Sequence, residues 1–194
     1  MAYASLADVK AYLKLTVTDT ADDALITSLV ARAQAAIDSY KQRTFEALSD
    51  TERTFDAVRD VDGAYLSLDA DLCAVTSITN GDGTTVTTGQ YVTDPRNGTP
   101  YFRIKLLSSS GVAWTYTTDP EDAISVVGKW AYSATAPADI VQACVRWAAH
   151  MYRQKDSSTF ETTVYPNAGI IERPMGMPAD VKMLLGNGGR RITT

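Results

Sequence analysis

The hydrophobic period of the sequence changes twice between its ends, and these changes restrict the folds that the chain can adopt. As far as Arg43, apolar residues recur every three or four positions, the spacing of one helix face. From there to about Ser133 they fall into short runs rich in Thr, Val, Tyr and Phe, which are typical of strands. Helical spacing returns after Pro137. The pattern predicts an α+β fold, with a small antiparallel α-helical bundle and a β-rich antiparallel insertion between its second and third helices.

Two helices are expected before the insertion. The stronger pattern lies between Ile26 and Tyr40, and Asp22 and Asp23 precede it, where acidic residues complement the helix dipole. The weaker pattern covers Ser5 to Leu15. Its start is supported by Ser5 and the aspartate three positions later, which resemble a capping box.

Two more helices are expected after the insertion. Pro137 opens the first, since proline in a first turn loses no hydrogen bond. Residues 156–177 show no period and predict a long loop. Pro178 to Leu185 can form two further helical turns, stopped by Gly186. These boundaries predict a discontinuous helical domain (1–49 and 134–194) and a β-rich insertion (50–133).

The insertion is expected to consist of hairpins. Apolar residues alternate with polar ones from Phe102 to Leu106 and again from Val112 to Tyr116, as in half-buried strands. Pairs such as Asp62-Gly63 and Asn97-Gly98 tolerate the positive φ angles of tight turns. Aromatic residues of this region could stack on single-stranded nucleic acid, but the alternation favours core packing for Tyr91, Tyr101, Phe102, Trp114, Tyr116 and Trp130.

Charge and composition exclude several classes of function. A net charge of -5 and a pI of about 4.8 are the opposite of what a phosphate-neutralising DNA reader carries. No apolar stretch is long enough for a membrane span, and the first residues lack a secretory pattern, so we expect synthesis in the cytoplasm. Cys73 and Cys144 fit neither a disulfide framework nor a zinc or redox spacing.

A search for catalytic chemistry finds no site. His150 is the single histidine, and it lies between Arg146 and Arg153 on the polar side of an expected helix, so a solvated or interface position is favoured. Asp60, Asp62, Asp69 and Asp71 could attract a cation, but their order does not match a calcium loop and favours turns and strand ends. We therefore expect no enzyme activity, no cofactor and no metal.

Three segments resemble the head-tail connector (adaptor) family of tailed bacteriophages. The first comprises Leu6–Leu15, the second Asp22–Ile26 with Ala33–Tyr40, and the third Pro137–Arg153. A β insertion separates the second from the third, as in the longer members of that family. The resemblance implies a structural protein of the virion neck that forms a ring, usually twelve-fold in that family, beneath the portal. Such a ring extends the DNA channel for passing double-stranded DNA, without sequence-specific contacts, and attaches the next neck, stopper or tail protein.

The same resemblance suggests two sets of interface residues. The C-terminal segment of connectors commonly reaches the portal, and the hypothetical docking residues here are Val181, Met183, Leu184, Leu185, Arg190 and Arg191. A helix packed on its own domain is the equal alternative. Ion pairs between ring subunits could use Asp22, Asp23, Asp38, Arg146, His150 and Arg153, although a solvated face is favoured.

Two other functions stay open on the sequence. One is a tail-completion protein, or another neck protein that binds the tail tube. The other is a small carbohydrate-binding or hydrolase module built on the β region.

Overall fold

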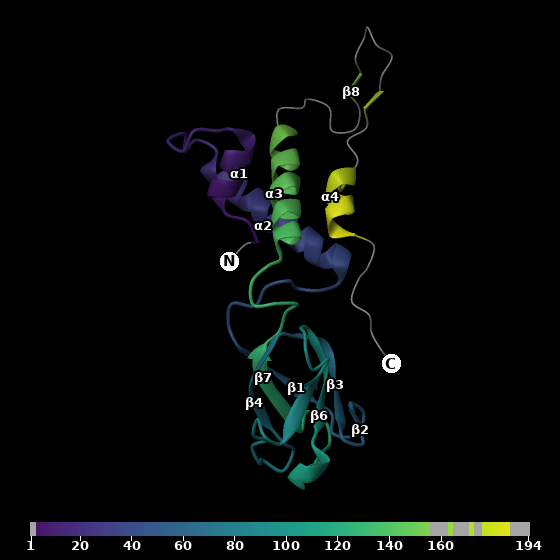
Figure 1. Ribbon diagram of the computed structural model, residues 1–194. Helices are drawn as coiled ribbons and strands as arrows, with labels where there is room; N and C mark the ends of the chain where they lie inside the picture. Colours follow the sequence, from purple (N-terminus) through teal and green to yellow (C-terminus); the bar gives the residue numbers. More distant parts are fainter. Residues whose placement is uncertain (1–2, 156–162, 165–170, 173–175, 187–194) are drawn as a thin grey trace. The chain divides into compact units, whose positions relative to one another are not determined.

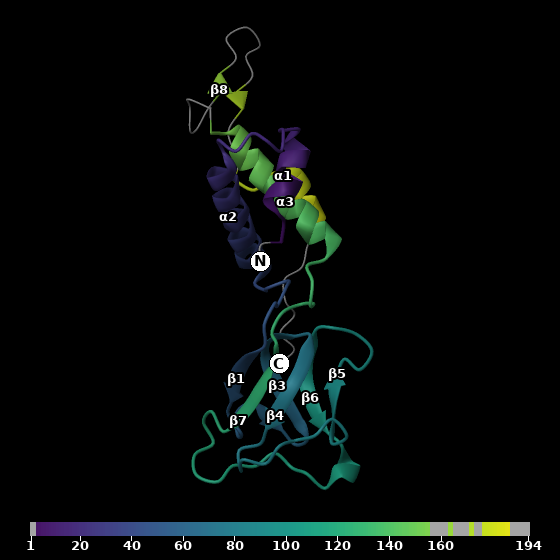
Figure 2. The same ribbon diagram turned by 90° about the vertical axis from the view of Figure 1, so that its left-hand side faces the viewer.

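The computed structural model describes residues 3–155, 163–164, 171–172 and 176–186 (Figures 1 and 2). The chain divides into two compact units. One, which we call the helical unit, joins Met1–Gln42 to Pro137–Thr194, and the other, the β unit, is Arg43–Ala136. Helices and antiparallel sheets together confirm the expected α+β class.

The helical unit is built around its third helix. Its helices are α1 (Leu6–Leu13), α2 (Asp23–Lys41), α3 (Ala138–Arg153) and α4 (Ala179–Leu185). Helix α3 contacts each of the other three, and Figure 1 shows it between α1 and α4. None of the helices in the described part of the chain is long and apolar enough to cross a membrane.

Local sequence explains where α1 begins and where α1 and α2 end. Ser5 caps α1 by accepting a hydrogen bond from the Asp8 N–H at 3.2 Å, while the Asp8 carboxylate accepts one from the Ser5 N–H at 2.8 Å. The expected capping box is therefore confirmed. Lys14 and Gln42 stop α1 and α2 in the left-handed conformation.

Small residues let α3 pack closely against its neighbours. Ala143, Cys144 and Ala148 are completely buried, opposite the buried stripe of α2 that includes Ile26 and Ile37. Tyr40, expected on this apolar face, is instead 48% exposed, because Lys41 takes the last buried position of the helix.

The β unit contains two antiparallel sheets. The first has the order β1 (Thr51–Phe55), β7 (Ile124–Lys129), β4 (Ala74–Thr79). The second has the order β2 (Val61–Asp62), β3 (Tyr65–Leu72), β6 (Tyr101–Leu106), β5 (Tyr91–Asp94). Both sheets contribute to one core, which contains Phe55, Leu66, Leu68, Leu72, Ile78, Val86, Ile104, Leu106, Ile124, Val126 and Trp130.

Residues 112–116, expected as a strand, do not form one. Instead, their backbone groups form hydrogen bonds with the side chain of Asn80, a residue that is only 2% exposed. Its Nδ2 donates to the Ala113 carbonyl at 2.9 Å, and its Oδ1 accepts from the Thr115 N–H at 3.2 Å. An amide side chain here replaces a neighbouring strand, and only an isolated bridge joins Gly81 to Tyr116.

The expected alternation along β6 also changes at one position. Ile104 and Leu106 are buried as predicted, but Tyr101 and not Phe102 packs against the core. The pairing with β3 shifts register between Ser67 and Leu72, which brings Leu72 opposite Tyr101.

The expected loop 156–177 lies mostly outside the described residues. Within it, β8 (Thr163–Val164) pairs with β9 (Ile171–Glu172), a short ladder that the absence of any sequence period did not predict. The helix after the loop is confirmed, and Gly186 ends it at φ +63°.

Candidate assembly surfaces

The three aspartates predicted at a subunit interface each have a partner within the chain. The Asp22 carboxylate accepts hydrogen bonds from Lys155 and, at 2.6 Å, from the Tyr152 hydroxyl, and these bonds lower its pKa. Asp23 pairs with the buried Lys10 at 2.6 Å. These contacts join the start of α2 to the end of α3 and to α1.

Asp38 differs from the other two because it is half buried. The Tyr3 hydroxyl donates to its carboxylate at 2.5 Å, but burial outweighs this bond and raises the pKa of Asp38. This contact attaches the N-terminal segment to α2.

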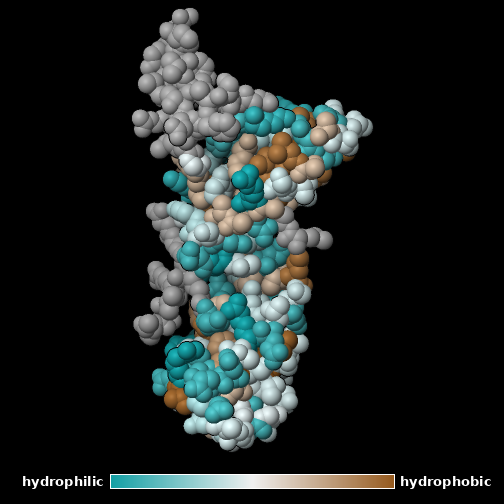
Figure 3. All heavy atoms as spheres, turned by 180° about the vertical axis from the view of Figure 1, so that it is seen from behind, coloured by the Kyte–Doolittle hydropathy of each residue, from teal (hydrophilic) through white to brown (hydrophobic). Residues whose placement is uncertain are grey.

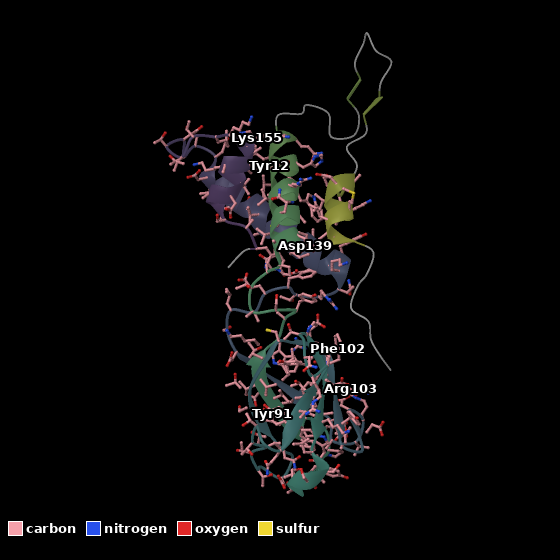
Figure 4. The ribbon with its side chains drawn as sticks, viewed as in Figure 1. Tyr12, Tyr91, Phe102, Arg103, Asp139 and Lys155 are labelled. Atoms are coloured by element: carbon pink, nitrogen blue, oxygen red, sulfur yellow. The ribbon has the colours of Figure 1, made fainter. Side chains whose placement is uncertain are left out.

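The predicted basic residues of α3 also have partners in the helical unit. Arg146 pairs with Asp180 of α4 at 3.1 Å, and the Arg153 guanidinium lies 6.0 Å from the centre of the Tyr12 ring. The His150 ring is 3.0 Å from the Gln154 amide. Figure 4 shows Tyr12 at the same end of the helical unit as Lys155. Pairing of these residues with a neighbouring subunit stays a prediction, and it would compete with the internal contacts.

The predicted docking residues of α4 divide into two groups. Val181 and Leu185 are buried, at 0% and 6% exposure, so they attach α4 to its own unit. Met183 is 78% exposed and Leu184 is partly exposed, so these two stay open to a partner. Arg190 and Arg191 lie outside the described residues.

Two buried lysines are structural residues that the sequence interpretation missed. Lys10 donates to the carbonyl of Asp19 at 2.5 Å and to that of Val17 at 3.4 Å, in addition to its pair with Asp23. Lys41 donates to the carbonyl of Leu185 at 2.8 Å and so holds the end of α4, where a cation complements the helix dipole. Position 41 continues the buried stripe four residues after Ile37, which is the signal that could have revealed it.

The outer face of α2 is the least charged exposed helix face among the described residues. Its exposed side chains are mostly small, with one charged residue and a large apolar residue near each end: Ala24, Leu25, Thr27, Ser28, Ala31, Arg32, Ala35, Ser39 and Tyr40. Figure 3 shows apolar side chains on the helical unit from the side on which α2 lies nearest the viewer. An exposed helix that faced only water would carry more charge.

The negative charge belongs to the β unit. It contains thirteen Asp and Glu residues against seven Lys and Arg, whereas the helical unit contains ten against eleven. Several of these acids are neutralised internally: Asp71 pairs with Arg43, and Asp69 with Arg53. No group of three or more potential metal-ligating side chains occurs among the described residues.

The aromatic residues of the β unit serve mainly its core, as the alternation favoured. Trp130 is buried and donates to the Thr51 carbonyl at 2.9 Å, and Trp114 donates to the Ala64 carbonyl at 3.0 Å. Tyr91 and Tyr101 pack against the same core, whereas Tyr116 is 43% exposed. The described aromatic side chains therefore do not form one continuous stacking surface.

Comparison with known proteins gives one family and one fold. The family model described as "Head completion protein" matches residues 2–185. No curated protein matches the chain.

Solved structures of gene transfer agent (GTA) particles contain chains of similar fold. A chain in "Neck of empty GTA particle computed with C6 symmetry" has 21% identity and a TM-score of 0.55, and the match covers 97% of this chain and 90% of that one. A chain in "Neck of native GTA particle computed with C12 symmetry" has 20% identity, the same coverage and a TM-score of 0.54. The same values describe a chain in "Virion of native gene transfer agent (GTA) particle".

Proposed function

The chain belongs to the head completion protein family, and from this membership we propose that it is a structural connector in the neck of a tailed-phage-type particle. The observation that carries the proposal is the match of the family model from residue 2 to residue 185, which includes the whole β unit and most of the helical unit. In this role the protein forms a ring beneath the portal, extends the DNA channel and offers a surface to the next neck or tail component. It acts by assembly, without catalysis or a cofactor.

A twelve-fold ring is the assembly that we propose. One neck with a chain of similar fold was computed with C12 symmetry and another with C6 symmetry, and a twelve-fold ring is compatible with both. Each subunit of a cyclic ring needs two different surfaces that meet on rotation. The outer face of α2 supplies a weakly charged surface, and exposed Met183 on α4 supplies an apolar contact for a neighbour or for the portal.

In this proposal the two units have different roles. The helical unit is the connector domain, and the β unit is an insertion between α2 and α3. Because the β unit carries the excess of carboxylates, it would repel the phosphates of passing DNA and would not grip them. The protein would thus guide DNA through the channel without retaining it.

Counting copies in purified particles tests the proposal. Quantitative mass spectrometry with isotope-labelled peptides would compare this chain with the portal subunit, and a tail-tube protein would serve as an internal control. We expect equal numbers of this chain and of portal subunits. If the chain is well expressed in the producing cell but missing from the particle, the connector function is wrong.

A further inference from the structure

Within the part of the chain that the structure describes, strand β5 has one unpaired edge, and a shallow groove of about 500 Å³ lies along it. The groove is lined by Thr88, Tyr91, Val92, Thr93, Arg96 and Asn97. Side chains of successive strand residues point to opposite faces of a sheet, so three consecutive residues can line one hollow only where it follows the strand edge. Figure 2 shows β5 beside β6 at the margin of its sheet.

The hydrogen-bond phase of β5 identifies the backbone groups at this edge. The Leu107 N–H donates to the Gln90 carbonyl at 2.8 Å, and Tyr91 lies opposite Leu106. In an antiparallel pair, directly opposed residues alternate between bonded and non-bonded positions. Val92 and Asp94 therefore bond to β6, whereas the N–H and C=O groups of Tyr91 and Thr93 point away from it.

These outward groups have no backbone partner among the described residues. The situation differs at β4, the edge strand of the other sheet, where residues 84–86 continue the pairing: the Val86 N–H donates to the Ile78 carbonyl at 2.9 Å. An open strand edge accepts an extended chain as an additional strand.

One end of the groove carries a cation without an ion pair. Arg96 is exposed and makes no ion pair or hydrogen bond with any described residue, whereas Arg103 on the adjacent strand is bound to Asp94 at 2.8 Å. The β unit has an excess of acids, so an unpaired guanidinium next to a free backbone edge is a specific feature of this site.

We propose that the open edge of β5 binds an extended, acidic segment of a partner protein, which adds a strand at Tyr91 and Thr93 and places a carboxylate on Arg96. Backbone hydrogen bonds to the two free N–H and C=O pairs supply the attachment. The guanidinium, with the neighbouring Asn97 amide, selects the acidic sequence and sets the register. This proposal does not depend on the connector function proposed above.

The test is a titration of the isotope-labelled full chain with two capped five-residue peptides, followed by amide NMR. One peptide alternates valine with glutamate, and the other alternates valine with lysine. We expect the acidic peptide to shift the Tyr91 and Thr93 amides and to slow their hydrogen exchange, and to bind roughly five times more tightly than the basic peptide.

Two variants with matched controls separate the backbone from the charge. Thr93→Pro removes an N–H that bonds to no described backbone group, so it should abolish binding, whereas Thr93→Val keeps the N–H and should bind normally. Arg96→Gln should weaken binding about fivefold and Arg96→Lys much less. If the proline variant does not fold, the two variants at Arg96 and the amide hydrogen exchange of the wild-type protein still test the site.

Three results would overturn the proposal. The first is an absence of amide shifts at β5 at millimolar peptide. The second is equal binding of the two peptides, and the third is a free chain that self-associates through β5, which would make a second copy the occupant. None of these results would change the copy number expected in particles, so failure here is distinct from failure of the connector function.

Discussion

Lys10 shows how one residue can determine the shape of a loop. Its ammonium group, on a side chain only 6% exposed, contacts two carbonyls of the loop between α1 and α2 and the Asp23 carboxylate. Lys10→Met keeps the length of the side chain but leaves these acceptors without their donor. We expect a loss of about 1–3 kcal/mol in the free energy of unfolding, measured by urea denaturation.

The neighbouring exposed lysine is the control for this change. Lys14→Met removes the same charge from a residue at the end of α1 and should leave the stability almost unchanged. Equal losses for the two variants would show that the net charge, and not the buried contact, is responsible.

Asp22 should stabilise the fold only when it is charged. Lys155 and Tyr152 lower its pKa in the folded chain, so its contribution is present above the ordinary pKa of an aspartate and is lost as the pH falls through the folded value. Asp22→Asn should therefore be less stable than the wild type at neutral pH, and the difference should shrink between about pH 5 and about pH 2. Glu121→Gln, at an exposed position, is the control and should show no such trend.

Asp38 should show the opposite dependence on pH. Burial raises its pKa, so the folded chain binds this proton more tightly than the unfolded chain does, and ionisation destabilises the fold. Asp38→Asn should gain stability relative to the wild type as the pH rises from about 3 to about 6. Denaturation midpoints of both proteins at several pH values measure this gain. If the stability of Asp38→Asn relative to the wild type falls over this pH range, the raised pKa of Asp38 is wrong.

At the scale of elements, the pairing of β7 with β4 depends on a residue without a side chain. A Cβ on Gly128 would meet the Ala74 carbonyl oxygen and would lie 2.9 Å from Leu72 Cδ1, next to the register shift of β4. Gly128→Ala should therefore lower the free energy of unfolding by about 1–3 kcal/mol. In Gly89→Ala, the added Cβ has no neighbour within 4 Å, so a comparable loss there would contradict the steric explanation.

The helices and some strands could be predicted because their signals are local. The capping box at Ser5 and the alternation from Arg103 to Leu106 each depend on a few neighbouring residues. Residues 112–116 have the same alternation, but a side chain distant in sequence, Asn80, takes their backbone groups. A local pattern cannot reveal such a partner.

The candidate surfaces could be predicted less well for the same reason. The sequence named Asp22, Asp38 and Arg146 as candidates for ion pairs between subunits. Only the fold shows that Lys155, Tyr3 and Asp180 already contact them. Val181 and Leu185 are equally apolar as docking residues or as core residues, and burial decides for the core.

At the scale of the whole molecule, the family match confirms the resemblance to phage connectors. The distribution of charge between the two units is a separate observation, which comes from the structure. Sequence alone gives a net charge of -5, but the division into units shows that acids exceed bases by six in the β unit alone. In the ring proposed above, this excess of carboxylates would repel the phosphates of DNA that comes close to the β unit.

This distribution predicts that the free chain does not bind duplex DNA. Fluorescence anisotropy with a labelled 30-base-pair duplex should show a dissociation constant weaker than about 10⁻⁴ M at physiological salt, the weak limit for proteins that bind DNA non-specifically. Lowering the salt should not create binding, because repulsion between the negatively charged chain and the phosphates is screened less at low salt. Replacing two exposed acids of the β unit, Asp119→Lys and Glu121→Lys, should strengthen any residual contact and make it depend on salt. Micromolar binding by the wild type that weakens steeply with salt would contradict this prediction. It would mean that a basic surface of the chain binds the phosphates despite the acidic β unit, and that the protein retains DNA in the channel.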